Sequence, residues 1–112
     1  MGPQARFLAA AQAESEVVDA RGRKLALRRL SSLDKLRLFK AAGPVLSQNV
    51  MWLGMAVLAA TVTAIDDVPV PGPGSEAQIE ALVQVLGEEG LAAVGASLAS
   101  SRVEIDPDVA KN

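Results

Sequence analysis

The stretch from Ala41 to Ile65 contains no charged residue, and it constrains this chain more than any other feature of the sequence. A helix that crosses a bilayer needs roughly 20 consecutive apolar residues. The pair Gly43-Pro44 and the polar residues 47–49 interrupt the stretch, so its continuous apolar run begins only at Val50. That run is too short for a membrane span. We expect it to form a buried central helix of a soluble protein.

Helix-capping residues divide the rest of the chain into short helices. Ser31 with Asp34, and Ser75 with Gln78, have the spacing of capping boxes at helix starts. Gly43 and Gly87 have the position of glycines that end a helix. The sequence therefore predicts about four helices: one before Gly43, the central apolar one, one from about Gln78 to Gly87, and one that follows Gly87.

Residues 16–28 have the pattern of a β-hairpin. Leu25 and Leu27 alternate with other residues, as in a strand with one buried face. Gly22 supplies the positive φ that a tight turn requires. Because an isolated hairpin is marginally stable in water, we expect Val17 and the two leucines to pack on the helices. The side chains expected in solvent on the open face are those of Arg21, Arg23, Lys24 and Arg28.

A segment rich in proline and glycine separates the central helix from the later ones. Asp66 and Asp67 predict a turn, and the whole segment VTAIDDVPVPGPGS, residues 62–75, predicts a short strand pair or an extended strap. The predicted fold is mostly α within the α+β class: an N-terminal hairpin, then a bundle of about four short helices with the strap. Residues 1–15 form an N-terminal arm, helical or disordered, residues 16–100 a single domain, and residues 101–112 a flexible tail.

The residue types that most often carry chemistry are missing. The chain has no cysteine and no histidine, which removes thiolate nucleophiles, the commonest general base at neutral pH and the commonest zinc ligands. We expect no catalytic site, no cofactor and no metal. The lack of cysteine also favours a cytoplasmic location.

Most of the positive charges lie in one region. Eight Lys and Arg residues fall between Arg21 and Lys40, whereas none occurs from Ala41 to Ser101, where six acids do. A basic face can neutralise phosphates, but no aromatic platform or known DNA-binding spacing accompanies it. We therefore expect a solvated face or an acidic protein partner, and no nucleic acid. The residues of this predicted basic face are Arg21, Arg23, Arg28 and Arg29.

The central helix also predicts a contact surface. A helix that is apolar all round is difficult to cover in so small a domain, so we expect part of it to stay exposed until another subunit covers it. Methionine adapts to differently shaped partners, and tryptophan is a large anchor. The predicted contact residues are Met51, Trp52, Met55 and Leu58. The alternative, that these side chains are ordinary core, stays open at this point.

Most of the chain resembles the small tail assembly chaperones of phages and prophages. The resembling segments are VVDARGRKLALRRLSSLDKLRLFKAAG, Gln48-Asn49, VTAIDDVPVPGP and SEAQIEALVQVLGEEGLAAV, within residues 16–98. Asp67 departs from the pattern, because a glycine is expected in that turn. The resemblance implies a non-enzymatic protein of the bacterial host's cytoplasm that binds the tape measure protein, tail tube subunits or both.

Self-association is a further expectation, since it would cover the same apolar surface when no client is bound. Two alternatives of other classes remain open. One is a small membrane-associated phage protein, although we expect no membrane partner. The other is a basic-faced regulator that binds nucleic acid.

Overall fold

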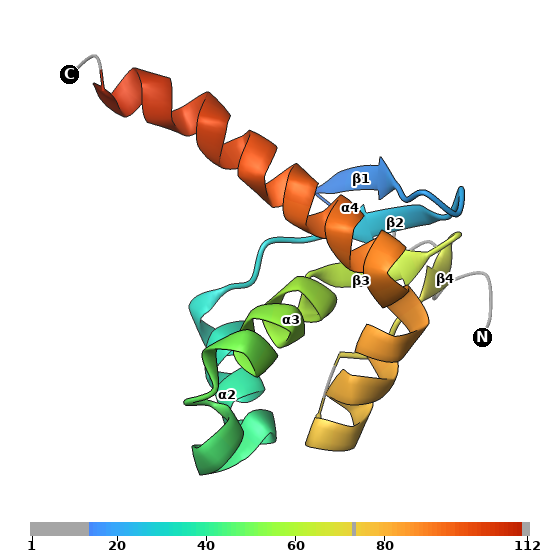
Figure 1. The fold of residues 1–112 in the computed structure, drawn as a ribbon, viewed down its shortest axis with the longest axis vertical. Coiled ribbons are helices and arrows are strands. Elements are labelled where there is room, and N and C mark those ends of the chain that lie inside the picture. Colours follow the sequence, from blue (N-terminus) through green and yellow to red (C-terminus); the bar gives the residue numbers. More distant parts are fainter. Residues whose placement is uncertain (1–13, 73, 111–112) are drawn as a thin grey trace.

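The computed structural model describes residues 14–72 and 74–110, and it places four strands and three helices in them (Figure 1). The expected α+β class is confirmed. The expectation of about four helices is wrong for the described part of the chain, where there are three. In chain order the elements are β1 (Ser15–Val18), β2 (Lys24–Leu27), α2 (Ser32–Leu46), α3 (Val50–Ala60), β3 (Val62–Ile65), β4 (Val68–Pro69) and α4 (Glu76–Ala110).

The four strands form one antiparallel sheet in the order β1-β2-β3-β4. The predicted hairpin is its β1-β2 pair, with φ of 81° at Gly22 in the connecting loop. The sequence did not predict that β3 would pair with β2. That pairing places Leu25 opposite Ile65 and joins the hairpin to the later strand pair.

The turn between β3 and β4 consists of Asp66 and Asp67, both with positive φ, 49° and 67°. Positive φ at both central residues is the signature of a type I′ hairpin turn, which usually contains glycine. Aspartate tolerates this region better than most residues. Lys24 supports the turn twice: its backbone N–H donates to Asp66 Oδ1 at 2.8 Å, and its Nζ lies 2.8 Å from Asp67 Oδ1. The turn therefore keeps this shape without the expected glycine.

Local capping fixes where α2 and α3 begin. Ser31 Oγ accepts from Asp34 N, and Asp34 Oδ2 accepts from Ser31 N, which confirms the predicted capping box. At Gly43, φ of 85° and ψ of 172° kink α2, and the helix then continues to Leu46. Asn49 caps α3 through a bond from Trp52 N to its side-chain oxygen. The helical conformation is therefore interrupted at Gly43, where the sequence predicted a helix end, and a short helical segment follows it to Leu46.

The helix α4 is likewise one ribbon with a break at Gly87, where φ is 65° and ψ is −171°. These angles belong to a region that only glycine occupies readily. The two helices predicted on either side of Gly87 are therefore the two halves of α4. Gln78 N donates to Ser75 Oγ as predicted, but Gln78 Oε1 accepts from Gly74 N, one residue before the expected partner.

The core lies between the sheet and the helices. Leu25 and Leu27 of β2 pack with residues of both halves of α4, and Val17 packs against this cluster, as the sequence predicted. A second cluster joins α2, α3 and α4 through Leu38, Ala56 and Ile79. The second half of α4 crosses the sheet and extends beyond it (Figure 1). The residues of the main cluster are Leu25, Leu27, Ala59, Val62, Leu82, Leu86 and Val94.

Two predicted segments lie wholly or partly outside this description. Residues 1–13 of the predicted N-terminal arm are outside the described residues, and β1 begins at Ser15. At the other end, α4 is helical as far as Ala110, so the predicted tail of residues 101–112 starts within this helix. The flexibility of that tail stays a prediction.

Candidate functional site

The structure separates the four predicted contact residues into two pairs. Met51 and Met55 lie one helical turn apart on α3 with 76% and 45% of their surface exposed. Trp52 is half-buried against the cluster that joins the three helices, and Leu58 is half-buried against the main core. The two methionines are therefore available to a partner, whereas Leu58 mainly holds α3 on the rest of the domain.

A small hollow lies beside Met55 where α3 meets α4. It has a volume of about 180 Å³ and is lined mainly by apolar side chains. Ligand pockets usually measure about 300–1000 Å³, so this hollow suits a single apolar side chain better than a small molecule. The Trp52 Nε1–H donates to Glu80 Oε2 at 3.2 Å, which ties the indole to α4. The lining residues are Trp52, Met55, Ile79, Glu80 and Val83.

Exposed apolar side chains continue over α2 and the corner between α2 and α3. The predicted contact residues did not include them, because apolar residues occur on several sides of both helices and give no clear periodic signal. Leu38 and Ala42 provide the buried side of α2. A small domain normally covers most such groups, so this exposure favours a surface that meets another protein. The exposed residues are Leu33, Leu36, Phe39, Val45 and Val50.

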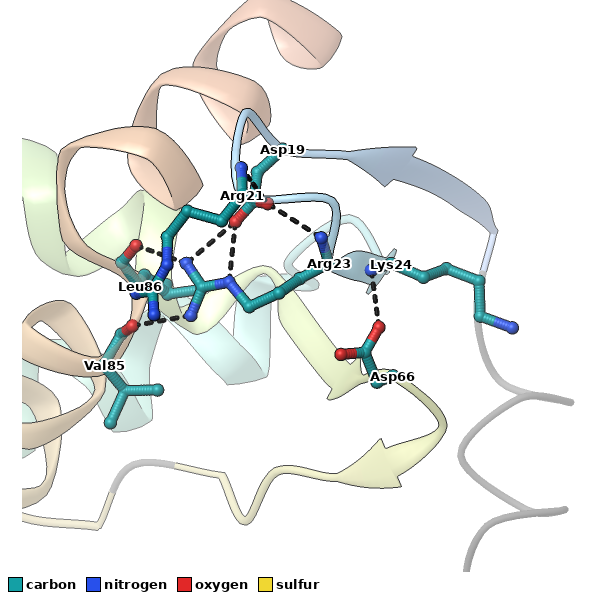
Figure 2. A network of polar contacts seen from close by, with 7 residues as sticks. All are labelled: Asp19, Arg21, Arg23, Lys24, Asp66, Val85 and Leu86. Carbon is teal, nitrogen blue, oxygen red and sulfur yellow. Dashed lines mark hydrogen bonds and ion pairs between the residues drawn. The ribbon is translucent and has the colours of Figure 1, made fainter.

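Arg23 does not stand in solvent as the sequence predicted, and this correction changes the basic face. Its side chain is 15% exposed and pairs with the fully buried carboxylate of Asp19 at 2.8 Å (Figure 2). Its Nη1 and Nη2 donate to the backbone oxygens of Val85 and Leu86 at 2.8 and 2.7 Å. These carbonyls end the first half of α4, so Arg23 caps that half just before the break.

Asp19 organises the turn that carries Arg23. Its Oδ1 accepts the backbone N–H groups of Arg21 and Arg23, and its Oδ2 accepts Arg23 Nε. Burial alone raises the pKa of this carboxyl, but the bonds and the charge of Arg23 outweigh it, so the pKa lies below the ordinary value of 3.8. Sequence reasoning missed this role of Asp19. The local sequence feature that could have indicated this role is an Asp followed closely by Gly22 and Arg23.

The other predicted basic residues are not equivalent either. Arg28 pairs with Asp34 at 3.2 Å, which also helps, after the Ser31 bonds, to keep the pKa of the Asp34 carboxyl below its usual value. Arg21 and Arg29 are exposed and have no ion-pair partner among residues 14–72 and 74–100. Two of the four arginines are thus partly neutralised within the chain, which weakens a phosphate-binding face.

A larger hollow than the one beside Met55 is a cleft between α2 and the strap, which here means residues 70–72 and 74–75 between β4 and α4. Its volume is about 950 Å³. Leu38 of α2 and Val70 of the strap contribute to an aliphatic lining, and Arg37 and Lys40 of α2 line it as well. No described residue lines both this cleft and the hollow beside Met55.

Two further observations bear on function. Within the described residues, no three acidic side chains come together as a metal site would require.

One described helical segment, Glu76–Ser100, is long and apolar enough to cross a membrane by length and composition alone. This segment contains the break at Gly87 and the buried core residues Ile79 and Leu86, and 22% of its apolar window is buried within the protein.

The uncharged stretch from Ala41 to Ile65, which raised the possibility of a membrane span, is not one helix. It extends over the end of α2, all of α3 and β3. At 1.5 Å per residue, the 11 residues of α3 reach roughly 16 Å, about half the hydrocarbon thickness of a bilayer.

Comparisons with models of protein families, with curated proteins and with solved structures find no match to this chain. The resemblance to tail assembly chaperones therefore depends on the sequence segments alone.

Proposed function

We propose that this chain is a non-enzymatic tail assembly chaperone, which binds an apolar segment of the tape measure protein and keeps it soluble while tail tube subunits assemble. The observation that supports this most is the exposure of Met51 and Met55 beside an apolar hollow on the α3 and α4 side of the molecule. Helix-in-groove recognition uses adaptable methionines and pockets for single anchor side chains.

The proposed client contact has a definite chemistry. An amphipathic client helix would cover the two methionines and place one apolar side chain in the hollow. Glu80 is the carboxylate at that hollow, and no Lys or Arg occurs in residues 41–101 of the chain. A client helix with a Lys or Arg beside its apolar face would therefore fit best.

The test is co-expression with the tape measure protein encoded in the same gene cluster. Wild-type chain should keep the client soluble and purify with it. The double variant Met51→Glu/Met55→Glu should lose at least half of the soluble client, because it places charges at the contact while retaining good helix formers. Val18→Glu is the matched control, since Val18 is an exposed apolar residue on β1.

The outcomes separate the proposal from its alternatives. A client that is equally soluble without the chain would contradict a chaperone role. A chain that needs detergent to purify would favour membrane association through α4. DNA retardation at low salt that is lost in Arg21→Glu/Arg29→Glu would favour a nucleic-acid regulator, because these two arginines have no ion-pair partner among the described residues.

A further inference from the structure

The cleft between α2 and the strap combines an aliphatic lining with positive charge at one wall. The half-buried Leu30 and Val70 belong to its lining, and Arg37 and Lys40 are exposed side chains that line it from α2. In the part of the chain that the structure describes, neither cation has an ion-pair partner. An unpaired cation beside apolar surface favours a ligand that presents a carboxylate next to an aliphatic group.

The carboxylates of the cleft do not cancel this preference. Asp34 already pairs with Arg28 at 3.2 Å and accepts the N–H of Ser31 at 2.9 Å. Glu76 is the other acid of the lining, and it lies in the first turn of α4, where the helix dipole offsets part of a negative charge. The cleft is therefore lined by two cations that have no ion-pair partner among the described residues, Arg37 and Lys40, and by one available carboxylate, that of Glu76, while the charge of Arg37 also acts on Asp34.

The size and lining of the cleft decide which kind of acidic ligand it suits. Its volume of about 950 Å³ lies at the upper end of small-molecule pockets, and the cleft is open to solvent. Among the described residues, its lining contains no aromatic side chain on which a nucleobase could stack. The cleft therefore suits a stretch of polypeptide lying in an open groove better than a small carboxylate in an enclosed pocket.

We propose that the cleft between α2 and the strap binds a segment of a partner protein that carries Asp or Glu beside an aliphatic side chain. Arg37 and Lys40 pair with the carboxylates, and the aliphatic side chain lies against the half-buried Leu30 and Val70. This surface is separate from the proposed client contact at Met51 and Met55. The chain then has two docking surfaces of different charge preference, and either one can be disabled alone.

Fluorescence anisotropy with a defined probe tests this directly. The probe is a labelled peptide with repeated Glu-Ser-Leu, and the matched probe has Lys in place of Glu. The full chain should bind the acidic peptide, more weakly as salt rises. Arg37→Glu/Lys40→Glu should weaken binding at least about tenfold, because it replaces two attractive charge pairs by two repulsive ones.

The matched variant is Arg21→Glu/Arg29→Glu, which changes the net charge equally but alters no residue of the cleft lining. It should change the affinity less than about threefold. Equal binding of the Lys probe, absence of binding by the acidic probe, or an equal loss in both double variants would overturn the proposal. Sedimentation velocity completes the test: self-association that disappears in Arg37→Glu/Lys40→Glu would make a second copy the occupant and would also overturn it.

Discussion

Arg23 donates its Nη2 hydrogen to the backbone oxygen of Leu86 at 2.7 Å, so a residue before β2 caps the first half of α4 across 63 positions of sequence. The same side chain pairs with the buried Asp19 (Figure 2). One arginine thereby joins the hairpin loop, a buried carboxylate and the break in α4. Gly90 leaves room for this arrangement, because a Cβ there would lie 2.9 Å from Leu86 Cβ and 3.3 Å from Arg23 Nη2.

Replacing Arg23 should therefore reduce stability more than replacing any exposed arginine. Arg23→Met keeps the aliphatic stem but removes the bonds to Val85 and Leu86 and leaves Asp19 without its counter-ion. We expect the free energy of unfolding to fall by about 2–4 kcal/mol, measured by urea denaturation. Arg29→Met is the control and should stay within about 0.5 kcal/mol of wild type. Equal effects of the two variants would show that the cap does not stabilise the fold.

The ion pair also predicts an acid-sensitive fold. The folded-state pKa of Asp19 lies below 3.8, so the native state favours the ionised carboxyl, against the effect of its burial. The corresponding stability is fully present above the unfolded-state pKa of about 3.8. It is lost as the pH falls through the lower folded-state value. Unfolding midpoints measured from pH 6 down to pH 2.5 should fall steeply below pH 4.

Asp19→Asn is the variant that isolates this contribution. It should be less stable than wild type at pH 6 and should lose less stability between pH 4 and pH 2.5, because the titrating group is gone. Asp34 has a lowered pKa as well, so a residual slope is expected in this variant. If Asp19→Asn lost stability as steeply as wild type between pH 4 and pH 2.5, the acid sensitivity would belong to other carboxyls.

The break in α4 predicts opposite effects for two glycines. Gly87 has a backbone conformation that side chains with a Cβ rarely adopt, so Gly87→Ala should destabilise the fold by about 1–3 kcal/mol. Gly95 lies within the second half of α4, and a Cβ there would meet nothing within 4 Å. Gly95→Ala should stabilise the fold by about 0.5–1 kcal/mol. Thermal unfolding followed by circular dichroism measures both. Stabilisation by both variants would mean that α4 is straight at Gly87.

The elements that could be predicted from the sequence are those set by neighbouring residues. The Ser31 capping box, the Gly22 loop and the turn at Asp66 depend on side chains a few positions apart. The pairing of β2 with β3 could not be predicted, because the paired residues Ala26 and Ala64 are far apart in the sequence. Their side chains are also too small to indicate a partner. The predicted number of helices was wrong although both glycine signals mark real interruptions: the backbone is non-helical at Gly43 and Gly87, but helix resumes directly after each, so the described residues contain three helices.

The candidate contact surface on α3 could likewise be predicted only in part from the sequence. Composition alone indicated that α3 is apolar all round, but not which side would remain open. The structure exposes Met51 and Met55 and half-buries Trp52, because Ile79 and Glu80 of α4 lie against the indole side of α3. The role of Arg23 was equally hidden, since nothing in a hairpin sequence shows that helix carbonyls more than 60 residues away will meet it.

Trp52 offers a direct readout of the proposed client contact, because it is the single tryptophan and lines the hollow beside Met55. A client helix that covers this hollow removes water from the indole, so its emission should shift to shorter wavelength and its quenching by acrylamide should fall at least about twofold. Met51→Glu/Met55→Glu should show neither change at the same client concentration, and Val18→Glu should show both. A client that binds with unchanged Trp52 emission would place the contact elsewhere, with the exposed Leu36 and Phe39 of α2 as the next residues to test.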